Sequence, residues 1–291
     1  MMMRISLYLI VLATLSFAAP GSFAGQGAVT ADLEFDFADW PGPAVPVRVY
    51  VPATATADTP VVIVMHGASR DAERYYNDWR AAAAQRGFIV AVPYFSRDDF
   101  PRSAQYNLGH VFDPGDGRRR PESQWTFAAI EPLFDAVVNR LDGRQTHYTL
   151  FGHSAGSQFV HRFLYYIPDA RVERAIAANA GWYTMPDFGV QYPYGLAGAG
   201  VPEDVLAGYF ARDLVVLLGD ADTLRDDNDL RKTPEAELQG RHRYDRGHTF
   251  YRVARARAEA MGTEFNWRLV TVPGAGHSNA AMTPAAALLV D

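Results

Sequence analysis

The sequence contains no cysteine among its 291 residues. The chain therefore forms no disulfide bond, offers no thiolate to a metal ion and has no cysteine nucleophile. It also has no cysteine that could carry a lipid anchor. Any covalent catalysis must use another side chain, and the stability of the fold must come from the size of its core.

The chain also has no excess of positive charge: it contains 27 Lys and Arg and 33 Asp and Glu, which gives a net charge of −6. Nucleic acids and anionic membrane surfaces prefer basic proteins, so neither is a favoured partner. No pair of histidines has ligand spacing with a third ligand nearby, so no catalytic metal is expected. The acidic run at 226–229 is more typical of a solvated loop than of a calcium site.

The chain also lacks an apolar run of the roughly 20 residues that a membrane-spanning helix needs. Its longest run, ISLYLIVLATLSF, has about thirteen residues and follows Arg4. Small residues at Ser22 and Ala24 complete the pattern of a secretory signal over residues 1–24, with a short membrane anchor as the alternative. We expect export to the periplasm or the medium, without membrane integration after signal removal. The oligomeric state stays open.

Apolar strand patterns alternate with helical patterns along the rest of the chain, which predicts an α/β fold. The fold class expected is a mostly parallel central sheet with helices on both faces, in a single domain over residues 25–291. Two segments interrupt the alternation: an aromatic loop at 182–200 and a charged insertion at 224–247. Strands are predicted at 45–52, 61–67, 88–95, 146–153, 174–181, 213–219 and 266–274, and helices at 71–87, at 121–143 with a kink at Pro132, and after Ser154.

The stretch FGHSAGSQF places Ser154 between Gly152 and Gly156, in a G-x-S-x-G pattern between a buried strand and a helix. A sharp strand-to-helix turn crowds the backbone, and glycines at these two positions allow the strand and the helix to pass closely. The turn directs the serine hydroxyl outward at the positive end of the helix. We predict that Ser154 is a nucleophile; the alternative is a passive serine in a glycine-rich turn.

A serine hydroxyl needs a base to take its proton and an acid to orient that base. Asp222 follows the strand at 213–219, and His277 follows the last strand between flanking glycines, so the order is serine, acid, histidine. Asp222 is preferred to Asp220 because the third residue beyond Gly219 has turned away from the strand and can reach sideways to a histidine, and Asp220 is kept as the alternative. His153 is expected to pack beneath the serine turn, and His161 to lie on the helix surface or in the core.

An acyl-transfer intermediate also needs donors for its oxyanion. The backbone N–H of Ala155, directly after the nucleophile, is one candidate. The second is Ala68, which follows His66 and Gly67 in the turn after the first buried strand. The alternative for this second segment is an ordinary glycine turn.

With these residues in this order, the sequence resembles the α/β-hydrolase fold family over nearly all of the chain. The HGASRDAERY turn and the aromatic loop resemble secreted esterases related to poly(3-hydroxybutyrate) depolymerases and feruloyl esterases. The resemblance implies hydrolysis of a small-molecule or oligomeric ester through a serine acyl-enzyme, without a cofactor. The chain departs from that pattern in having no disulfides, a long segment between acid and base, and no separate polymer-binding domain.

Substrate contacts are predicted from the aromatic loop, chiefly Trp182 and Tyr183, with Tyr192 and Tyr194 further along it. The alternative is that these aromatics pack the loop onto the scaffold. Arginines at 241, 243 and 246 are predicted to begin a surface helix and pair with nearby acids, rather than to bind a substrate carboxylate. Two other functions stay open: a serine peptidase or amidase, and a non-catalytic binding protein.

Overall fold

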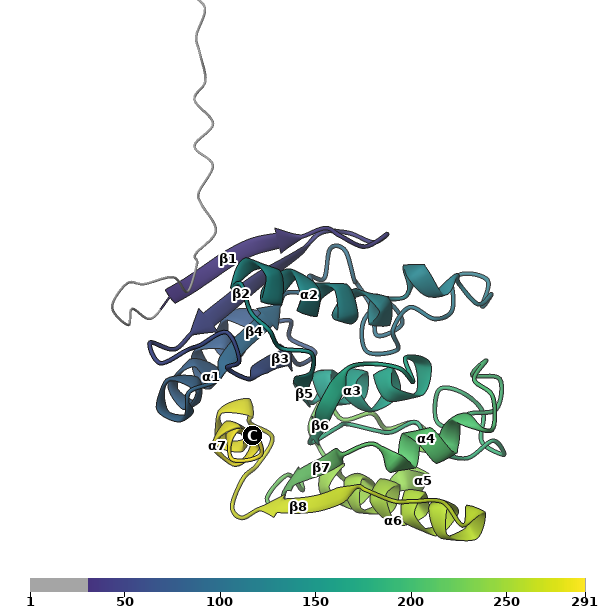
Figure 1. Cartoon of the computed structure of the whole chain (residues 1–291). Helices are drawn as coiled ribbons and strands as arrows, with labels where there is room; N and C mark the ends of the chain where they lie inside the picture. Colours follow the sequence, from purple (N-terminus) through teal and green to yellow (C-terminus); the bar gives the residue numbers. More distant parts are fainter. Residues whose placement is uncertain (1–30, 291) are drawn as a thin grey trace, which may run out of the picture.

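A computed structural model describes residues 31–290 and contains an eight-stranded sheet (Figure 1). The predicted signal at 1–24 lies outside the described residues. The strand order is β1-β2-β4-β3-β5-β6-β7-β8, and the strands from β4 to β8 in this order run parallel, with β1 and β2 antiparallel at one edge. The strands are β1 (Ala31–Phe37), β2 (Val45–Val51), β3 (Val61–Met65), β4 (Ile89–Pro93), β5 (Tyr148–His153), β6 (Val172–Ala178), β7 (Leu214–Gly219) and β8 (Arg268–Val272).

Helices cover both faces of this sheet, so the predicted fold class is confirmed. On one face, α1 (Ala72–Arg86) and α7 (Asn279–Ala287) pack on alternate residues of the central strands. On the other face lie α2 (Ile130–Arg140), α3 (Ala155–Tyr166), α4 (Val205–Ala211) and α6 (Arg243–Met261). A short helix, α5 (Pro234–Gln239), precedes α6. No helix within residues 31–290 is both long enough and apolar enough to cross a membrane.

Several element boundaries differ from the sequence prediction for local reasons. The helix expected at 121–143 begins only at Ile130, after two 3-10 turns at Glu122–Gln124 and Thr126–Ala129. Pro132 therefore lies in the first turn, where its missing N–H costs no intrahelical bond, and the expected kink was wrong. The segment at 224–247 contains α5 and the start of α6. Neither β1, whose residues alternate between half-buried and exposed, nor the proline-containing α7 was predicted.

The turn between β5 and α3 has the close backbone approach that the glycine pattern predicts. A Cβ on Gly156 would overlap the carbonyl oxygen of Met65 in β3, and a Cβ on Gly152 would overlap the backbone of Gly156. Ser154 itself adopts φ 59° and ψ −116°, a strained conformation for a residue with a side chain. The role predicted for the two glycines is confirmed.

Replacing Gly156 with alanine should lower the free energy of unfolding by about 2–3 kcal/mol, because rigid backbone atoms occupy the space of the new methyl group. Gly208 in α4 provides the control, since a Cβ added there would meet no atom within 4 Å. Gly208→Ala should stabilise the protein by about 0.5–1 kcal/mol through helix propensity. Urea unfolding of both variants measures the contrast; equal effects would contradict the close approach.

Candidate active site

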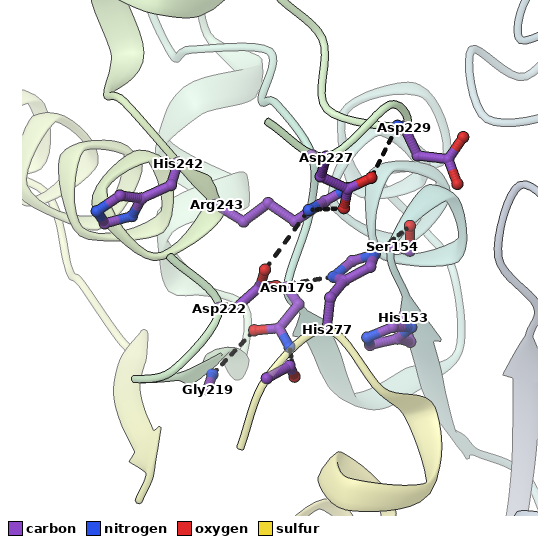
Figure 2. Close-up of polar contacts among 12 residues, drawn as sticks. His153, Ser154, Asn179, Gly219, Asp222, Asp227, Asp229, His242, Arg243 and His277 are labelled. Carbon is purple, nitrogen blue, oxygen red and sulfur yellow. Dashed lines mark hydrogen bonds and ion pairs between the residues drawn. The ribbon is translucent and has the colours of Figure 1, made fainter. Parts of the chain in front are cut away.

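Three side chains from distant parts of the chain meet at the carboxyl edge of the sheet (Figure 2). Ser154 follows β5, Asp222 follows β7 and His277 follows β8, and these strands are parallel, so their ends share one edge. His277 Nε2 lies 3.0 Å from Ser154 Oγ, and His277 Nδ1 lies 2.7 Å from Asp222 Oδ2. The arrangement forms a continuous hydrogen-bonded chain from a hydroxyl through an imidazole to a carboxylate.

The two candidate acids have different partners. Asp222 is 2% exposed and contacts His277, whereas Asp220 is exposed and accepts a hydrogen bond from the N–H of Gly274 at 2.7 Å. Asp220 therefore braces the turn after β8, which carries His277. Of the two carboxylates, the structure brings only Asp222 to the imidazole.

Asn179, at the end of β6, joins the turns that carry the acid and the histidine. Its Oδ1 accepts from the N–H of Gly219 at 2.9 Å, and its Nδ2 donates to the carbonyl of Gly276 at 3.3 Å. The residue is fully buried and has a positive φ of 50°, a conformation that asparagine tolerates better than most residues. Sequence reasoning missed it, although a polar residue ending an apolar strand at this edge was a usable signal.

Two of the three arginines near the start of α6 are buried, so the predicted surface location was wrong for them, although both pair with acids as predicted. Arg243 and Arg246 are 1% and 0% exposed, while Arg241 is exposed. The start of α6 packs on the face of the sheet, with Gly247 against Leu218 of β7, and positions 243 and 246 are buried there. Arg246 donates to the carbonyls of Gly181 and Gly240, and it pairs with Glu237.

Arg243 lies between two carboxylates (Figure 2). Its Nη1 is 2.6 Å from Asp227 Oδ2 and 3.5 Å from Asp222 Oδ1. Burial acts to raise the pKa of Asp227, but the N–H of Asp229 and the Arg243 guanidinium outweigh it, and the net pKa is below its usual value. Asp227 is therefore ionised at neutral pH and balances the charge of Arg243, which in turn contacts the second oxygen of Asp222.

His153 lies beneath the serine turn, as predicted. It is 3% exposed, and its ring centroid is 4.7 Å from that of His277. Burial, followed by the charges of His277 and Arg243, holds the pKa of His153 well below its usual value. The Tyr75 hydroxyl, whose pKa is raised by burial, lies within hydrogen-bonding distance of His153 Nδ1, at 3.0 Å. His153 is thus a neutral packing group.

His161 occupies the core, one of the two placements that the sequence allowed. Its Nε2 accepts a hydrogen bond from the N–H of Thr184 at 3.1 Å, and its Nδ1 lies 2.9 Å from the carbonyl oxygen of Ser157. No group of three or more potential ligands among the described residues forms a metal site.

The two predicted oxyanion donors border the same cleft. Ala155 is the first residue of α3, so its N–H has no partner within the helix. Ala68 follows Gly67, and a Cβ at Gly67 would lie 3.6 Å from Ser154 Cβ and 2.7 Å from the Tyr75 hydroxyl. The turn after β3 is thus held against the serine. Both alanines line a cleft of about 530 Å³.

The predicted aromatic contacts divide between the cleft and the core. Trp182 lines the cleft, although it is only 4% exposed. Tyr183 is fully buried, with its ring stacked 4.4 Å from that of Phe250 and its backbone bonded to Gln239, so it does not face the cleft and its assignment as a substrate contact is corrected. Tyr194 packs on Trp182 at 4.7 Å, and Tyr192 packs on Phe112 at 5.3 Å. The loop attaches to the scaffold largely through its own aromatics.

Removing Arg243 and removing the charge of Asp227 should shift the acid limb of the pH profile of kcat/KM in opposite directions. Arg243→Met removes a positive charge, stabilises a protonated His277 and should raise the midpoint of this limb by ~0.5–1 pH unit. Asp227→Asn leaves Arg243 unbalanced and should lower the midpoint by a similar amount. Arg255→Met, which removes an exposed cation paired with Glu259, is the control and should leave the profile unchanged. Shifts of the same sign in both variants would indicate general distortion instead.

Solved structures provide two close matches to the chain. A poly(aspartic acid) hydrolase-1 from Sphingomonas sp. KT-1 matches with a TM-score of 0.87 and 43% identity, over 89% of this chain and 98% of that one. The poly(3-hydroxybutyrate) depolymerase LpqC from Bordetella parapertussis matches with a TM-score of 0.82 and 35% identity, over 90% of each chain.

An S-formylglutathione hydrolase from Agrobacterium tumefaciens, with a TM-score of 0.56 and 16% identity over 90% of this chain and 93% of that one, supports the fold alone. No protein-family model matches the sequence, and no curated protein gives a significant match. The matched hydrolases support an ester-hydrolase activity in general terms. By its strand order and by the two close matches, the chain belongs to the α/β-hydrolase fold family.

Proposed function

We propose that the protein is a serine hydrolase that cleaves carboxylic esters through an acyl-enzyme intermediate. The observation that carries the proposal is the chain of hydrogen bonds from Ser154 to His277 at 3.0 Å and from His277 to Asp222 at 2.7 Å. A structural role would not require all three groups in this order next to a cleft lined by Ala155 and Ala68. The substrate proposed is a small-molecule or oligomeric ester, with no cofactor.

The first half-reaction follows from the tautomer that this geometry favours. His277 Nδ1–H donates to Asp222, which leaves Nε2 free to accept the proton of Ser154 Oγ as that oxygen attacks the ester carbonyl. The carbonyl oxygen becomes an oxyanion, which receives the N–H groups of Ala155 and Ala68. The imidazolium then passes its proton to the leaving alkoxide, the C–O bond breaks, and the acyl group remains on Ser154.

The second half-reaction repeats the first with water as the nucleophile. His277 takes a proton from water, the hydroxide attacks the acyl-enzyme, and the same two N–H groups stabilise the oxyanion. Ser154 recovers its proton when the acid product leaves. Asp222 is only 2% exposed, so water screens its charge little. It therefore stabilises the imidazolium of His277 more strongly than a solvated carboxylate could.

Labelling and kinetics of a matched serine pair test the proposal. A fluorophosphonate should add its mass to the peptide that contains Ser154, and Ser154→Ala should reduce kcat on 4-nitrophenyl esters by roughly 10⁴-fold or more. Ser157, three residues along α3 with a buried hydroxyl that has no partner among residues 31–290, is the control. Ser157→Ala should retain both labelling and activity.

Two outcomes would contradict the hydrolase proposal or point to another function. If the wild-type protein stays unlabelled and cleaves no ester, the hydrolase proposal fails. If it also binds a ligand with an affinity that Ser154→Ala leaves unchanged, the remaining interpretation is a non-catalytic binding protein on this scaffold.

We also propose that the protein is exported, on the basis of the signal pattern over residues 1–24. The intact mass of the protein recovered from periplasm or medium should correspond to a chain that begins at Gly25. Recovery of the uncleaved chain from the membrane fraction would instead favour the anchor.

A second candidate reaction is hydrolysis of an amide bond on the same serine machinery. The specific observation in its favour is the 43% identity with a poly(aspartic acid) hydrolase, because poly(aspartic acid) is a polyamide. An amine is a poorer leaving group than an alcohol, so His277 would have to protonate the nitrogen efficiently. Incubation with poly(aspartic acid) and with oligomers of 3-hydroxybutyrate, followed by assay of new amino and hydroxyl ends, compares the two reactions directly. We expect at least one polymer to be cleaved by wild type and neither by Ser154→Ala.

A further inference from the structure

Positive charge gathers in the cleft beside Ser154, although the whole chain has a net charge of −6. Four arginines line it together with the oxyanion residues Ala68 and Ala155: Arg70, Arg97, Arg102 and Arg231. They come from segments that are far apart in the sequence: the first three follow β3 and β4, and the last belongs to the segment between β7 and α5. Asp229 is the one acidic residue in the same lining.

None of these four arginines has a carboxylate within 4.0 Å among residues 31–290. Arg97 donates to the carbonyl of Ala68 at 2.7 Å, and Arg231 Nε donates to the hydroxyl of Tyr194 at 2.7 Å. Arg70 is 7% exposed and donates through Nη2 to the carbonyl of Phe100, while its Nη1 is buried without a partner. The cleft therefore holds guanidinium groups with unused donors.

A fifth arginine reinforces the charge from behind the cleft wall. Arg162 in α3 is fully buried, has no carboxylate partner in the described chain, and lies 4.1 Å from the ring centroid of Trp182. Arg231 lies over the same indole at 5.0 Å. Burial lowers the pKa of Arg162 to about 10, which still leaves it charged at neutral pH. The cleft wall at Trp182 is thus in contact with two cations.

Gln158 directs a further donor to this region. Its Oε1 accepts hydrogen bonds from Asn107 Nδ2 at 2.9 Å and from Arg162 Nη1 at 3.3 Å. These two bonds fix the orientation of the amide, with its oxygen facing Asn107 and Arg162. The amide nitrogen is then the group left to bind a ligand, and Gln158 lines the cleft one helical turn after Ser154. Arginine and amide donors together suit a planar oxyanion.

Arg97, Arg102 and Arg231 are exposed in the cleft without a carboxylate partner, and a carboxylate bound in bidentate fashion would satisfy their unused donors and balance their charge. We propose that the cleft binds a carboxylate carried by the substrate, so that the preferred substrates are anionic: half-esters of dicarboxylic acids, or oligomers with a carboxylate near the bond to be cleaved. This inference rests on the proposed serine hydrolase and names the substrate class of the same site.

Two 4-nitrophenyl esters that differ in charge but not in shape test the inference. The hydrogen succinate ends in a carboxylate, and the 4-methylpentanoate ends in an isopropyl group of similar size. After subtraction of the uncatalysed rates, wild-type kcat/KM should be at least ~10-fold higher for the succinate, as expected for one charge-assisted bond. The ratio of kcat/KM for the succinate to kcat/KM for the methylpentanoate should fall as the salt concentration increases from about 0.05 to about 0.5 M, because salt screens the attraction between the carboxylate and the arginines.

Arg102→Met is the clearest variant, because no contact of Arg102 within the described chain holds the fold together. It should lower the succinate to methylpentanoate ratio at least ~5-fold, mainly through KM of the succinate, and Arg231→Met should do the same. Arg257→Met removes another exposed cation, from α6, and should leave the ratio unchanged. Arg231 also contacts Tyr194 and Trp182, so an equal loss of kcat/KM on both esters in Arg231→Met alone would indicate a structural effect of that substitution. The ratio measured for Arg102→Met would then decide whether the inference holds.

A wild-type enzyme that cleaves both esters with similar efficiency, or that prefers the neutral one, would overturn the inference while leaving the serine hydrolase intact. An unchanged ratio in Arg102→Met together with Arg231→Met would overturn it as well. If neither ester is cleaved and Ser154 resists the fluorophosphonate, the proposed function has failed instead.

Discussion

The close contact between the start of α3 and the end of β3 determines the geometry of the whole site. Because Gly156 has no side chain, α3 begins directly against the carbonyl of Met65, and this places Ser154 beside the turn that carries Ala68. The strain at Ser154, with φ 59°, is the local cost of that contact. Without it, the hydroxyl and the two backbone donors would not lie on the same side of the cleft.

The remaining catalytic geometry depends on a buried carboxylate that needs several partners. Asp222 is 2% exposed, and an ionised group at that depth is tolerated only when polar groups replace its water. His277 and Arg243 approach its two oxygens, and Asn179 joins the turns on which Asp222 and His277 lie. The charge of Arg243 is itself balanced by Asp227, so the site extends one residue pair further than a serine, a histidine and an acid.

Local signals in the sequence predicted the parallel sheet, the serine turn and the order of the three polar residues. The G-x-S-x-G pattern has a local cause, since Gly152 and Gly156 contact backbone within the same unit or in the adjacent strand. The role of Arg243 depends on how α6 packs on the face of the sheet, which the pattern of residues in a highly charged segment does not predict. Trp182 lines the cleft while its neighbour Tyr183 is buried against Phe250 and His161, and this difference depends on contacts that are distant in sequence.

The arginines divide into two groups whose contrast bears on what the cleft binds. Arg243 and Arg246 are buried next to the site, and both have carboxylate partners within the chain. Arg97, Arg102 and Arg231 lie at the cleft itself, and no carboxylate of the described residues reaches them. Because these three arginines line one cleft in which Asp229 is the one acidic residue, we infer that the balancing negative charge comes from the substrate.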